Sequence, residues 1–412
     1  MLACQPVRVP NSMVVVTLES RCTHESLSSA IAGAGLSESD DQQLTFLFKG
    51  RCFFDASFIA ALVTWGNAYR ETGGEINFVG AKDLLDYLSR MDVFRQLNFE
   101  YEEDFDRHSE KGRFLPVFPV QDEDSVVEAS EAICELVLQR FDNAREFLPA
   151  MEWCVSEVID NVRVHSETAT PGAVCAQYYP KVHRLDIAIV DQGRGIRESL
   201  SQRLELTSHG EAITRALERG MTRDPNVGQG NGLAGTLEIV AKNAGGLHVW
   251  TGDSVFQRNV DGSEAVHVSN MFPGTGVYIS LNTNNPVNLE DTFIGDNGWS
   301  YISYVAEQAQ ESAGLKIKDE CRHTLGRETA RPFRRKIESM LPEMEEVLQL
   351  NFEGVRNATS SYLDELLGRL ADDIGEQEFR DRIRIVNAPE GLVNMANVVI
   401  AQRLAGNPVQ DD

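Results

Sequence analysis

Long apolar runs are absent from this sequence of 412 residues. No stretch reaches the roughly 18 consecutive apolar residues that a membrane-spanning helix needs. The N-terminal residues also lack the charged segment followed by an apolar run that marks a secretory signal peptide. We therefore expect a protein of the cytoplasm that does not span a membrane.

Paired cysteines are absent as well. The cysteines stand at positions 4, 22, 52, 134, 154, 175 and 321. No two of them have the C-x-x-C spacing that zinc sites and redox sites use. An odd number of scattered cysteines fits a reducing compartment, which agrees with the expected cytoplasmic location.

Basic residues are scarce in comparison with acidic ones. The chain has 38 Lys and Arg against 63 Asp and Glu, which gives a net charge of −25. Broad binding to nucleic acid or to an anionic membrane surface needs the opposite balance, so we expect neither partner. One small pocket for a nucleotide remains compatible with this charge. The G-x-x-x-x-G-K-[ST] motif of P-loop proteins does not occur in the sequence.

Alternating strand and helix patterns predict an α/β fold in every part of the chain. Short apolar strands at 13–18, 44–48 and 75–80 alternate with helices at 57–70 and 83–94. They predict a small first domain over residues 1–100, and the charged, Pro-bearing residues 101–123 read as a linker. Two long helices, 124–147 and 149–165, and strands at 184–190 and 277–281 predict a central domain over residues 124–284, followed by a boundary that is rich in Asn, Pro and Gly.

The C-terminal part, residues 299–412, repeats the pattern of the first domain. It has a predicted helix at 331–341, a strand at 347–352, a helix at 360–371 and a strand at 383–386. When Gly50 is aligned with Gly354 without gaps, Phe48 meets Phe352 and Ser57 meets Ser361. We therefore predict two related small modules on either side of the central domain.

Four motifs in the central domain carry polar or glycine residues at spacings that suit chemistry. Glu157 and Asn161 are four residues apart and share one helix face, where oxygen ligands can hold Mg²⁺. An ordinary polar helix face is the alternative. Asp191-Gln-Gly193-Arg-Gly195-Ile196 follows an apolar strand, so its carboxylate could accept a hydrogen bond from an exocyclic amine. A plain turn is the alternative there.

The other two motifs are rich in glycine. Gly228-Gln-Gly230-Asn231-Gly232-Leu233 precedes a helical run, which leaves backbone N–H groups free for phosphate oxygens. Pro273-Gly-Thr275-Gly leads into a strand, and by itself a hairpin turn explains it. Each motif has an ordinary structural explanation, but all four occur in one order.

That order resembles the GHKL superfamily of ATPases, which includes gyrase, heat-shock chaperones, histidine kinases and mismatch-repair proteins. The resemblance covers about 150 residues and is closest in style to the anti-sigma-factor serine kinases. It implies a central two-layer α/β sandwich, with helices on one face of a mixed sheet and the other face more open. It also implies ATP and Mg²⁺ as ligands and a homodimer, because members of the superfamily often pair.

The resemblance implies a role for each matching residue. Asn161 would bind Mg²⁺, and Glu157 would be the general base. Asp191 would bind the adenine amino group in a pocket shaped by Gly193, Gly195 and Ile196, with Thr275 supporting the adenine side. Gly228, Gly230, Asn231, Gly232 and Leu233 would close on the phosphates at the end of a lid over residues 198–227. Arg219, Thr222 and Arg223 of this lid could contact phosphates, and surface solvation is the alternative for them. Asp160 departs from the small apolar residue usual before this Asn, which leaves its role open.

The two flanking modules resemble STAS domains, the fold of anti-sigma-factor antagonists. In that family a Ser that opens the helix after a strand can be phosphorylated by a partner kinase, and Ser57 and Ser361 match its position. Phe58 replaces the Gly that often follows, and helix N-capping is the explanation that we favour over phosphorylation for both serines. Protein partners would bind through these modules.

Three functions remain open from the sequence. The first is an ATP-binding regulator in which ATP binding and hydrolysis are coupled to the STAS-like modules. The second is a serine/threonine kinase of the anti-sigma type that acts on STAS-domain serines. The third is a scaffold that binds ATP without turnover. ATP binding is common to all three, whereas the reaction, if any, differs.

Overall fold

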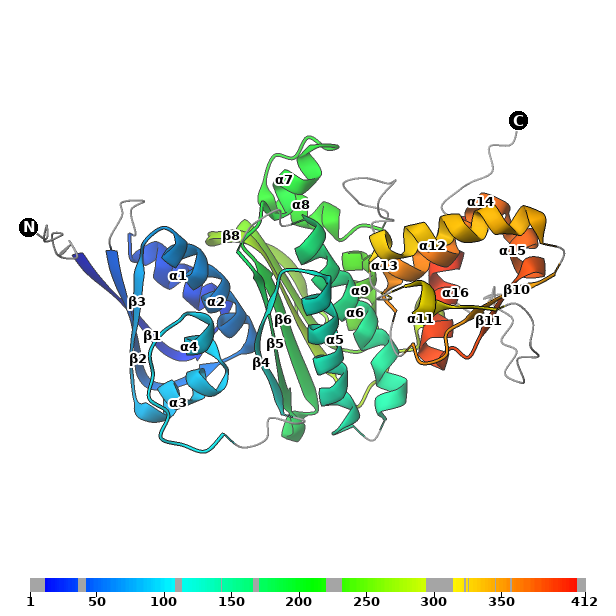
Figure 1. Ribbon diagram of the computed structural model, residues 1–412. Helices are drawn as coiled ribbons and strands as arrows, with labels where there is room; N and C mark the ends of the chain where they lie inside the picture. The colour runs from blue at the N-terminus through cyan, green and yellow to red at the C-terminus, as the bar shows by residue number, and fades with distance from the viewer. Residues whose placement is uncertain are drawn as a thin grey trace, which may run out of the picture. The chain divides into compact units, whose positions relative to one another are not determined.

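The computed structural model is a mixture of helices and sheets, which confirms the expected α/β class (Figure 1). The described residues are 12–35, 42–107, 113–141, 143–165, 170–219, 232–293, 314–321, 324, 326–344, 346–355 and 358–405. The chain forms two compact units: residues 1–121, 162–215 and 246–281 in the first, and residues 122–161, 216–245 and 282–412 in the second. The region predicted as one ATPase domain therefore contributes to both units.

The first unit begins with a small module around a parallel sheet of order β1-β2-β3. Its elements are β1 (Ser12–Cys22), α1 (His24–Gly33), β2 (Gln42–Phe54), α2 (Ala56–Glu71), β3 (Glu75–Val79), α3 (Lys82–Arg90) and α4 (Val93–Gln96). The helix predicted over 83–94 is divided into α3 and α4, because Asp92 adopts the left-handed conformation with a φ of 58°. The strands and the first long helix agree with the sequence pattern.

A larger sheet of order β4-β5-β6-β8-β7 completes the first unit. Its strands are β4 (Phe114–Val120), β5 (Gly172–Tyr179), β6 (Arg184–Asp191), β7 (Gly246–Arg258) and β8 (Glu264–Asn282), and α7 (Gly195–Ser201) and α8 (His209–Ala216) follow β6. The pairs β4–β5, β5–β6 and β7–β8 are antiparallel. The sequence pattern predicts β6 and the end of β8, whereas β5 and β7 carry no pattern that predicted them.

The linker predicted over residues 101–123 contains a strand, so that prediction is wrong for β4. Pro116 and Pro119 made this stretch look irregular. A strand at the edge of a sheet tolerates proline, because one of its sides needs no N–H donors. β4 lies at such an edge, and its pairing with β5 is interrupted between Leu115 and Phe118.

Helix α2 lies between two sheets of the first unit. Every residue from Ala56 to Gly66 is buried, which fits a helix that is apolar on all sides. One side packs on β3, and the other side packs on β5 and β6 (Figure 1). The sheet residues in the shared core include the small side chains of Ala173, Cys175 and Ala188, which allow a helix to approach closely. The expectation of an open sheet face is therefore wrong, because the N-terminal module covers part of it.

A buried histidine joins α1 to the larger sheet of the same unit. The His24 ring stacks on Trp250 with ring centroids 3.9 Å apart, and it meets His248 edge-on at 5.8 Å. His24 is only 2% exposed. Burial lowers the pKa of His24 well below its usual value, and the neighbouring His248 and His267 lower it further. This contact therefore requires a neutral His24.

Acidification is expected to weaken the first unit through His24. The folded-state pKa of His24 lies below its unfolded value near 6.5, so the stabilisation is present above that pH and is lost as the pH falls. One such group lowers the stability by about 1.4 kcal/mol for each pH unit below 6.5. Thermal unfolding at pH 7.5 and pH 5.5 should show a smaller loss of stability in His24→Phe than in the wild type. The exposed His183, changed to Asn, is the control, and an equal loss in all three proteins would contradict the prediction.

The second unit combines helices of the central region with the C-terminal module. Its elements are α5 (Glu123–Leu138), α6 (Ala144–His165, up to Asn161), α9 (Gly232–Lys242), α10 (Leu289–Phe293), β9 (Gly314–Lys316), α11 (Ile317–Glu320), α12 (Arg327–Met340), β10 (Leu348–Asn351), α13 (Ser360–Leu363), a π-helical turn η3 (Asp364–Gly368), α14 (Arg369–Ile374), α15 (Glu376–Arg382), β11 (Ile383–Val386) and α16 (Glu390–Ala405). The predicted helices 124–147 and 149–165 become α5 and α6. The break between them lies before Ala144, and Pro149 falls inside α6.

The C-terminal module repeats the topology of the N-terminal one. Its sheet has the order β11-β10-β9, again parallel with the second strand in the middle. Gly50 and Gly354 both have a positive φ, of 67° and 74°. Asp55 and Thr359, which match in the ungapped alignment, both cap the next helix by accepting a hydrogen bond from a backbone N–H. The structure thus confirms the internal similarity predicted from the sequence.

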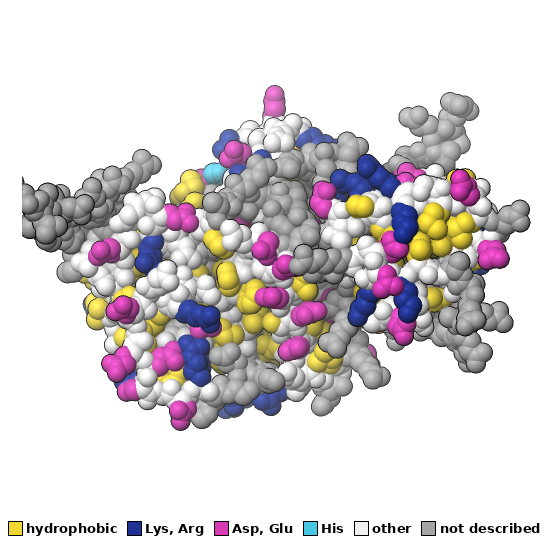
Figure 2. All heavy atoms as spheres, in the orientation of Figure 1, with side chains coloured by type: hydrophobic (Ala, Val, Ile, Leu, Met, Phe, Trp, Pro, Cys, Tyr) yellow, Lys and Arg dark blue, Asp and Glu magenta, His cyan; other side chains and the backbone are white. Residues whose placement is uncertain are grey.

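The surface in Figure 2 shows Lys and Arg side chains in small groups that alternate with Asp and Glu side chains. Among the residues that the structure describes, no helix is both long enough and apolar enough to cross a membrane. The six cysteines in the described part of the chain are free thiols.

Candidate functional site

The second and fourth motifs meet in the first unit. Asp191 ends β6 and is 6% exposed. Its Oδ1 accepts a hydrogen bond of 2.7 Å from the Gly193 backbone N–H, and the Thr275 backbone N–H also donates to this carboxylate. Burial raises the pKa of Asp191 to about 7, and the two N–H groups oppose the rise. A buried carboxylate held at this pKa can bind an amine or gain a proton close to neutral pH.

A close approach of the backbone explains why glycine precedes Thr275. A Cβ added to Gly274 would lie 2.1 Å from the carbonyl oxygen of Asp191, and Gly274 has a φ of 93°. Any side chain there would push β8 away from the end of β6. The glycine of the P-G-T-G motif is therefore needed for the contact between Thr275 and Asp191, and a hairpin turn alone does not explain it.

Thr251 belongs to this site, although none of the four motifs contains it. Its hydroxyl donates to the carbonyl of Gly274 at 2.8 Å and accepts from the backbone N–H of Ile196 at 3.2 Å. Ile196 and Gly195 form the first turn of α7. Thr251 thus ties the second motif to the fourth. The sequence around it, Trp-Thr-Gly-Asp, gave no signal because a lone Thr before Gly is typical of a turn.

The first and third motifs meet in the second unit. Glu157 and Asn161 lie one turn apart on α6, and both are half-buried. Gly232 is the first residue of α9, and a Cβ added there would lie 2.4 Å from Oε2 of Glu157. A side chain at position 232 would therefore displace the Glu157 carboxylate. Leu233 is the next residue of α9, whereas Gly228, Gly230 and Asn231 lie outside the described residues.

The electrostatic environment of Glu157 favours its protonated form. Burial raises the pKa of Glu157 to about 8, and the nearby carboxylates of Asp160 and Asp364 add to the rise. Arg327, on the C-terminal module of the same unit, has the opposite effect. A carboxyl group with a pKa in this range can take up and release a proton near physiological pH, which is what a general base requires.

Arg219, in the second half of the predicted lid, has a partner of its own. Its Nε donates to Oε1 of Glu238 at 2.6 Å, and its other nitrogen contacts Oε2 of the same carboxylate. The expectation that Arg219 contacts phosphates stays a prediction. Thr222 and Arg223 lie outside the described residues.

The two candidate phosphoacceptor serines are both buried. The Ser57 hydroxyl donates to Oδ1 of Asp55 at 2.6 Å and accepts from the backbone N–H of His24 at 3.1 Å. The Ser361 hydroxyl donates to Oδ2 of Asp160 at 3.1 Å. Their exposed fractions are 2% and 8%. Neither serine is the N-cap of its helix, because Asp55 and Thr359 fill that position, so the capping explanation is wrong for both.

Comparison with known proteins identifies one part of the chain. Residues 329–391 match a family model described as a STAS-like domain of unknown function. This match confirms the STAS-like resemblance of the C-terminal module, and it does not extend to the four motifs. No curated protein matches the chain.

Proposed function

We propose that this chain is a regulatory protein that binds and hydrolyses Mg-ATP through the four motifs and couples this reaction to its STAS-like modules. The observation that carries the proposal is the buried carboxylate of Asp191, held by the N–H groups of Gly193 and Thr275. Two motifs that are far apart in sequence meet at this group. The resemblance to GHKL ATPases assigns the adenine amino group to the same residue.

The donor set on α6 suits magnesium. Mg²⁺ prefers oxygen ligands and is usually held by one or two protein groups together with substrate phosphates and water. The amide oxygen of Asn161 provides one such ligand, and Glu157 lies one turn away. Among the described residues there is no group of three or more His, Cys, Asp or Glu that could hold a metal. The proposed site does not need one, because phosphate oxygens complete the coordination.

In this proposal each residue has one task. Asp191 accepts a hydrogen bond from the adenine amino group, and Asn161 holds the Mg²⁺ that neutralises phosphate charge. Glu157 takes a proton from the attacking water. To do so, its carboxyl group must already be deprotonated. A serine kinase acting on Ser57 or Ser361 of this chain would first have to expose a buried hydroxyl. We therefore place hydrolysis ahead of phosphoryl transfer to these serines.

Removal of the magnesium ligand is expected to weaken ATP binding only when Mg²⁺ is present. Asn161→Ala should raise the Kd for Mg-ATP by about 10- to 100-fold, as loss of a supporting metal contact typically does. Calorimetry with Mg²⁺ and with EDTA separates the metal effect from misfolding, because the two proteins should bind ATP equally in EDTA. Equal affinity in Mg²⁺ would contradict the role of Asn161, and a wild type that binds no adenine nucleotide would overturn the proposed function.

Incubation of the same protein with labelled Mg-ATP distinguishes the three functions that the sequence left open. Release of phosphate without label on the protein supports hydrolysis. Retention of ³²P on the protein supports the kinase alternative, and mass spectrometry then locates the modified residue. Binding without either result supports the scaffold alternative.

A further inference from the structure

Asp160 is the residue whose role the sequence left open, and the structure gives it a partner. It lies on α6 between Glu157 and Asn161, where related ATPases have a small apolar residue. Its Oδ2 accepts the hydrogen bond from Ser361, which lies in the first turn of α13 in the C-terminal STAS-like module. Both residues belong to the second unit. The unusual carboxylate at position 160 is thus engaged by the module itself.

Other contacts place the C-terminal part of the chain along α6. A Cβ added to Gly391 would lie 3.2 Å from Cγ of Pro149, near the start of the helix. Phe293 of α10 packs against Trp153 with ring centroids 4.9 Å apart, and α10 in turn packs on α16. Pro149, Trp153 and Asp160 lie on successive parts of α6. The contact at Asp160 is therefore the end of an extended interface and not an isolated hydrogen bond.

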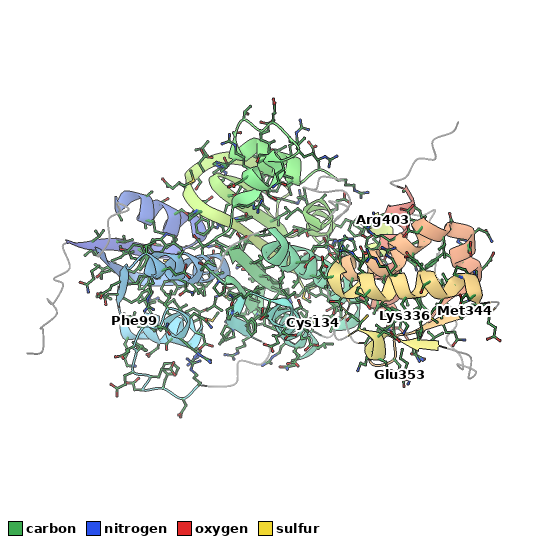
Figure 3. The ribbon with its side chains drawn as sticks, turned by 45° about the horizontal axis from the view of Figure 1, so that its top comes forward. Phe99, Cys134, Lys336, Met344, Glu353 and Arg403 are labelled. Carbon is green, nitrogen blue, oxygen red and sulfur yellow. The ribbon has the colours of Figure 1, made fainter. Side chains whose placement is uncertain are left out.

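A buried charge cluster fixes the module at this end. Asp364, which begins the π-helical turn after α13, is 2% exposed and pairs with Arg327 and Arg403. Arg403 is labelled in Figure 3. The Arg403 Nε donates to Oδ1 of Asp364 at 3.0 Å. The positive charge of Arg327 also acts on Glu157. The module therefore brings both a hydroxyl and a cation to the helix that carries the proposed magnesium ligand.

We propose that Asp160 is the docking residue through which the C-terminal STAS-like module responds to the nucleotide, with the Ser361–Asp160 hydrogen bond as the coupling contact. This inference rests on the proposed function. Mg-ATP bound at Asn161 changes the charge beside Asp160, and the hydroxyl of Ser361 transmits that change to α13. By linkage, the docked state of the module alters nucleotide affinity by the same factor.

Hydrogen exchange of the full chain tests this coupling. The probe is a non-hydrolysable ATP analogue with Mg²⁺, and its binding is measured separately by calorimetry. In the wild type, nucleotide should slow amide exchange in residues 359–368 by about tenfold, within the usual range of coupling between sites. In Ser361→Ala and in Asp160→Ala this slowing should be lost, while the analogue still binds.

Ser360→Ala is the matched control. Ser360 is buried next to Ser361, but its hydroxyl has no hydrogen-bond partner among the described residues. This variant should keep the wild-type response. Arg327 is left unchanged, because its loss would remove one of the cations that pair with buried Asp364.

Each outcome has a definite meaning. Loss of the response in both variants, but not in Ser360→Ala, supports the coupling. Bound nucleotide without a response in the wild type, or a response that survives in both variants, overturns the coupling and leaves ATP binding intact. Failure of the wild type to bind the analogue overturns the proposed function, and the coupling with it.

Discussion

Replacing Glu157 with Gln is expected to lower ATP turnover by about 10²- to 10⁴-fold, the usual contribution of a general base. ATP binding should persist, because Gln keeps the size of the side chain beside Gly232. In the wild type, kcat/KM should rise as the pH passes about 8, because it reports ionisation in the free enzyme and the pKa of Glu157 is raised to about 8 by burial. Steady-state phosphate release from pH 6 to 9.5 measures both effects.

The same substitution should increase stability in alkaline solution. The folded-state pKa of Glu157 lies above its unfolded value, so its stabilisation is present below about pH 4.5 and is lost as the pH rises through 8. A neutral Gln avoids that loss. Turnover and stability therefore move in opposite directions above pH 8, whereas damage to the fold would lower both.

Glu152→Gln provides the control on the same helix. Glu152 lies on α6 outside the motif, and burial raises its pKa to about 7, opposed by a hydrogen bond from the Cys134 thiol. This variant should gain stability above neutral pH and keep full turnover. Equal turnover in the Glu157 and Glu152 variants would remove Glu157 from the reaction.

Replacing Asp191 with Asn is expected to weaken ATP binding by roughly 10- to 100-fold, the cost of leaving a buried polar group without its partner. If the amide oxygen keeps the hydrogen bonds from Gly193 and Thr275, the amide NH₂ group meets the adenine NH₂ group, and both are donors. The wild type should bind ATP more weakly as the pH falls below about 7, because the carboxylate gains a proton. The variant should show no such pH dependence.

Titration calorimetry at pH 6, 7 and 8 tests this second prediction. Thermal unfolding should show that Asp191→Asn is at least as stable as the wild type at pH 8, because burial raised the pKa of the lost carboxyl group. Reduced binding together with reduced stability at pH 8 would indicate a structural defect. Wild-type affinity in the variant would remove Asp191 from the adenine site.

Local patterns were sufficient for part of this fold. The apolar strands at 44–48 and 184–190 and the duplicated Gly-x-loop-Ser pattern around Gly50 and Gly354 all follow from short-range periodicity, and the structure confirms them. The four motifs were also visible, because each combines glycine with a polar residue at a fixed spacing. Their joint role in ATP binding stays a prediction.

The missed features depend on contacts that are distant in sequence. β5 reads as a run of small residues, and its strand character comes from pairing with β4 and β6. β7 contains Gly252 with a φ of 57° at a break in its pairing with β8, which disguises a long strand as two short ones. The roles of Thr251 and Asp160 depend on partners in other segments, Ile196 and Ser361. No local pattern contains that information.

The position of α2 between two sheets has a consequence for the order of folding during synthesis. The N-terminal module leaves the ribosome before β5 and β6 have been made, so one apolar side of α2 then has no cover. Exposed surfaces of this kind make folding intermediates prone to aggregation. The nascent chain therefore has to keep this helix soluble until about 90 further residues have been added. Synthesis adds about 5–20 residues per second. A fragment that ends near residue 100 would remain permanently in that state.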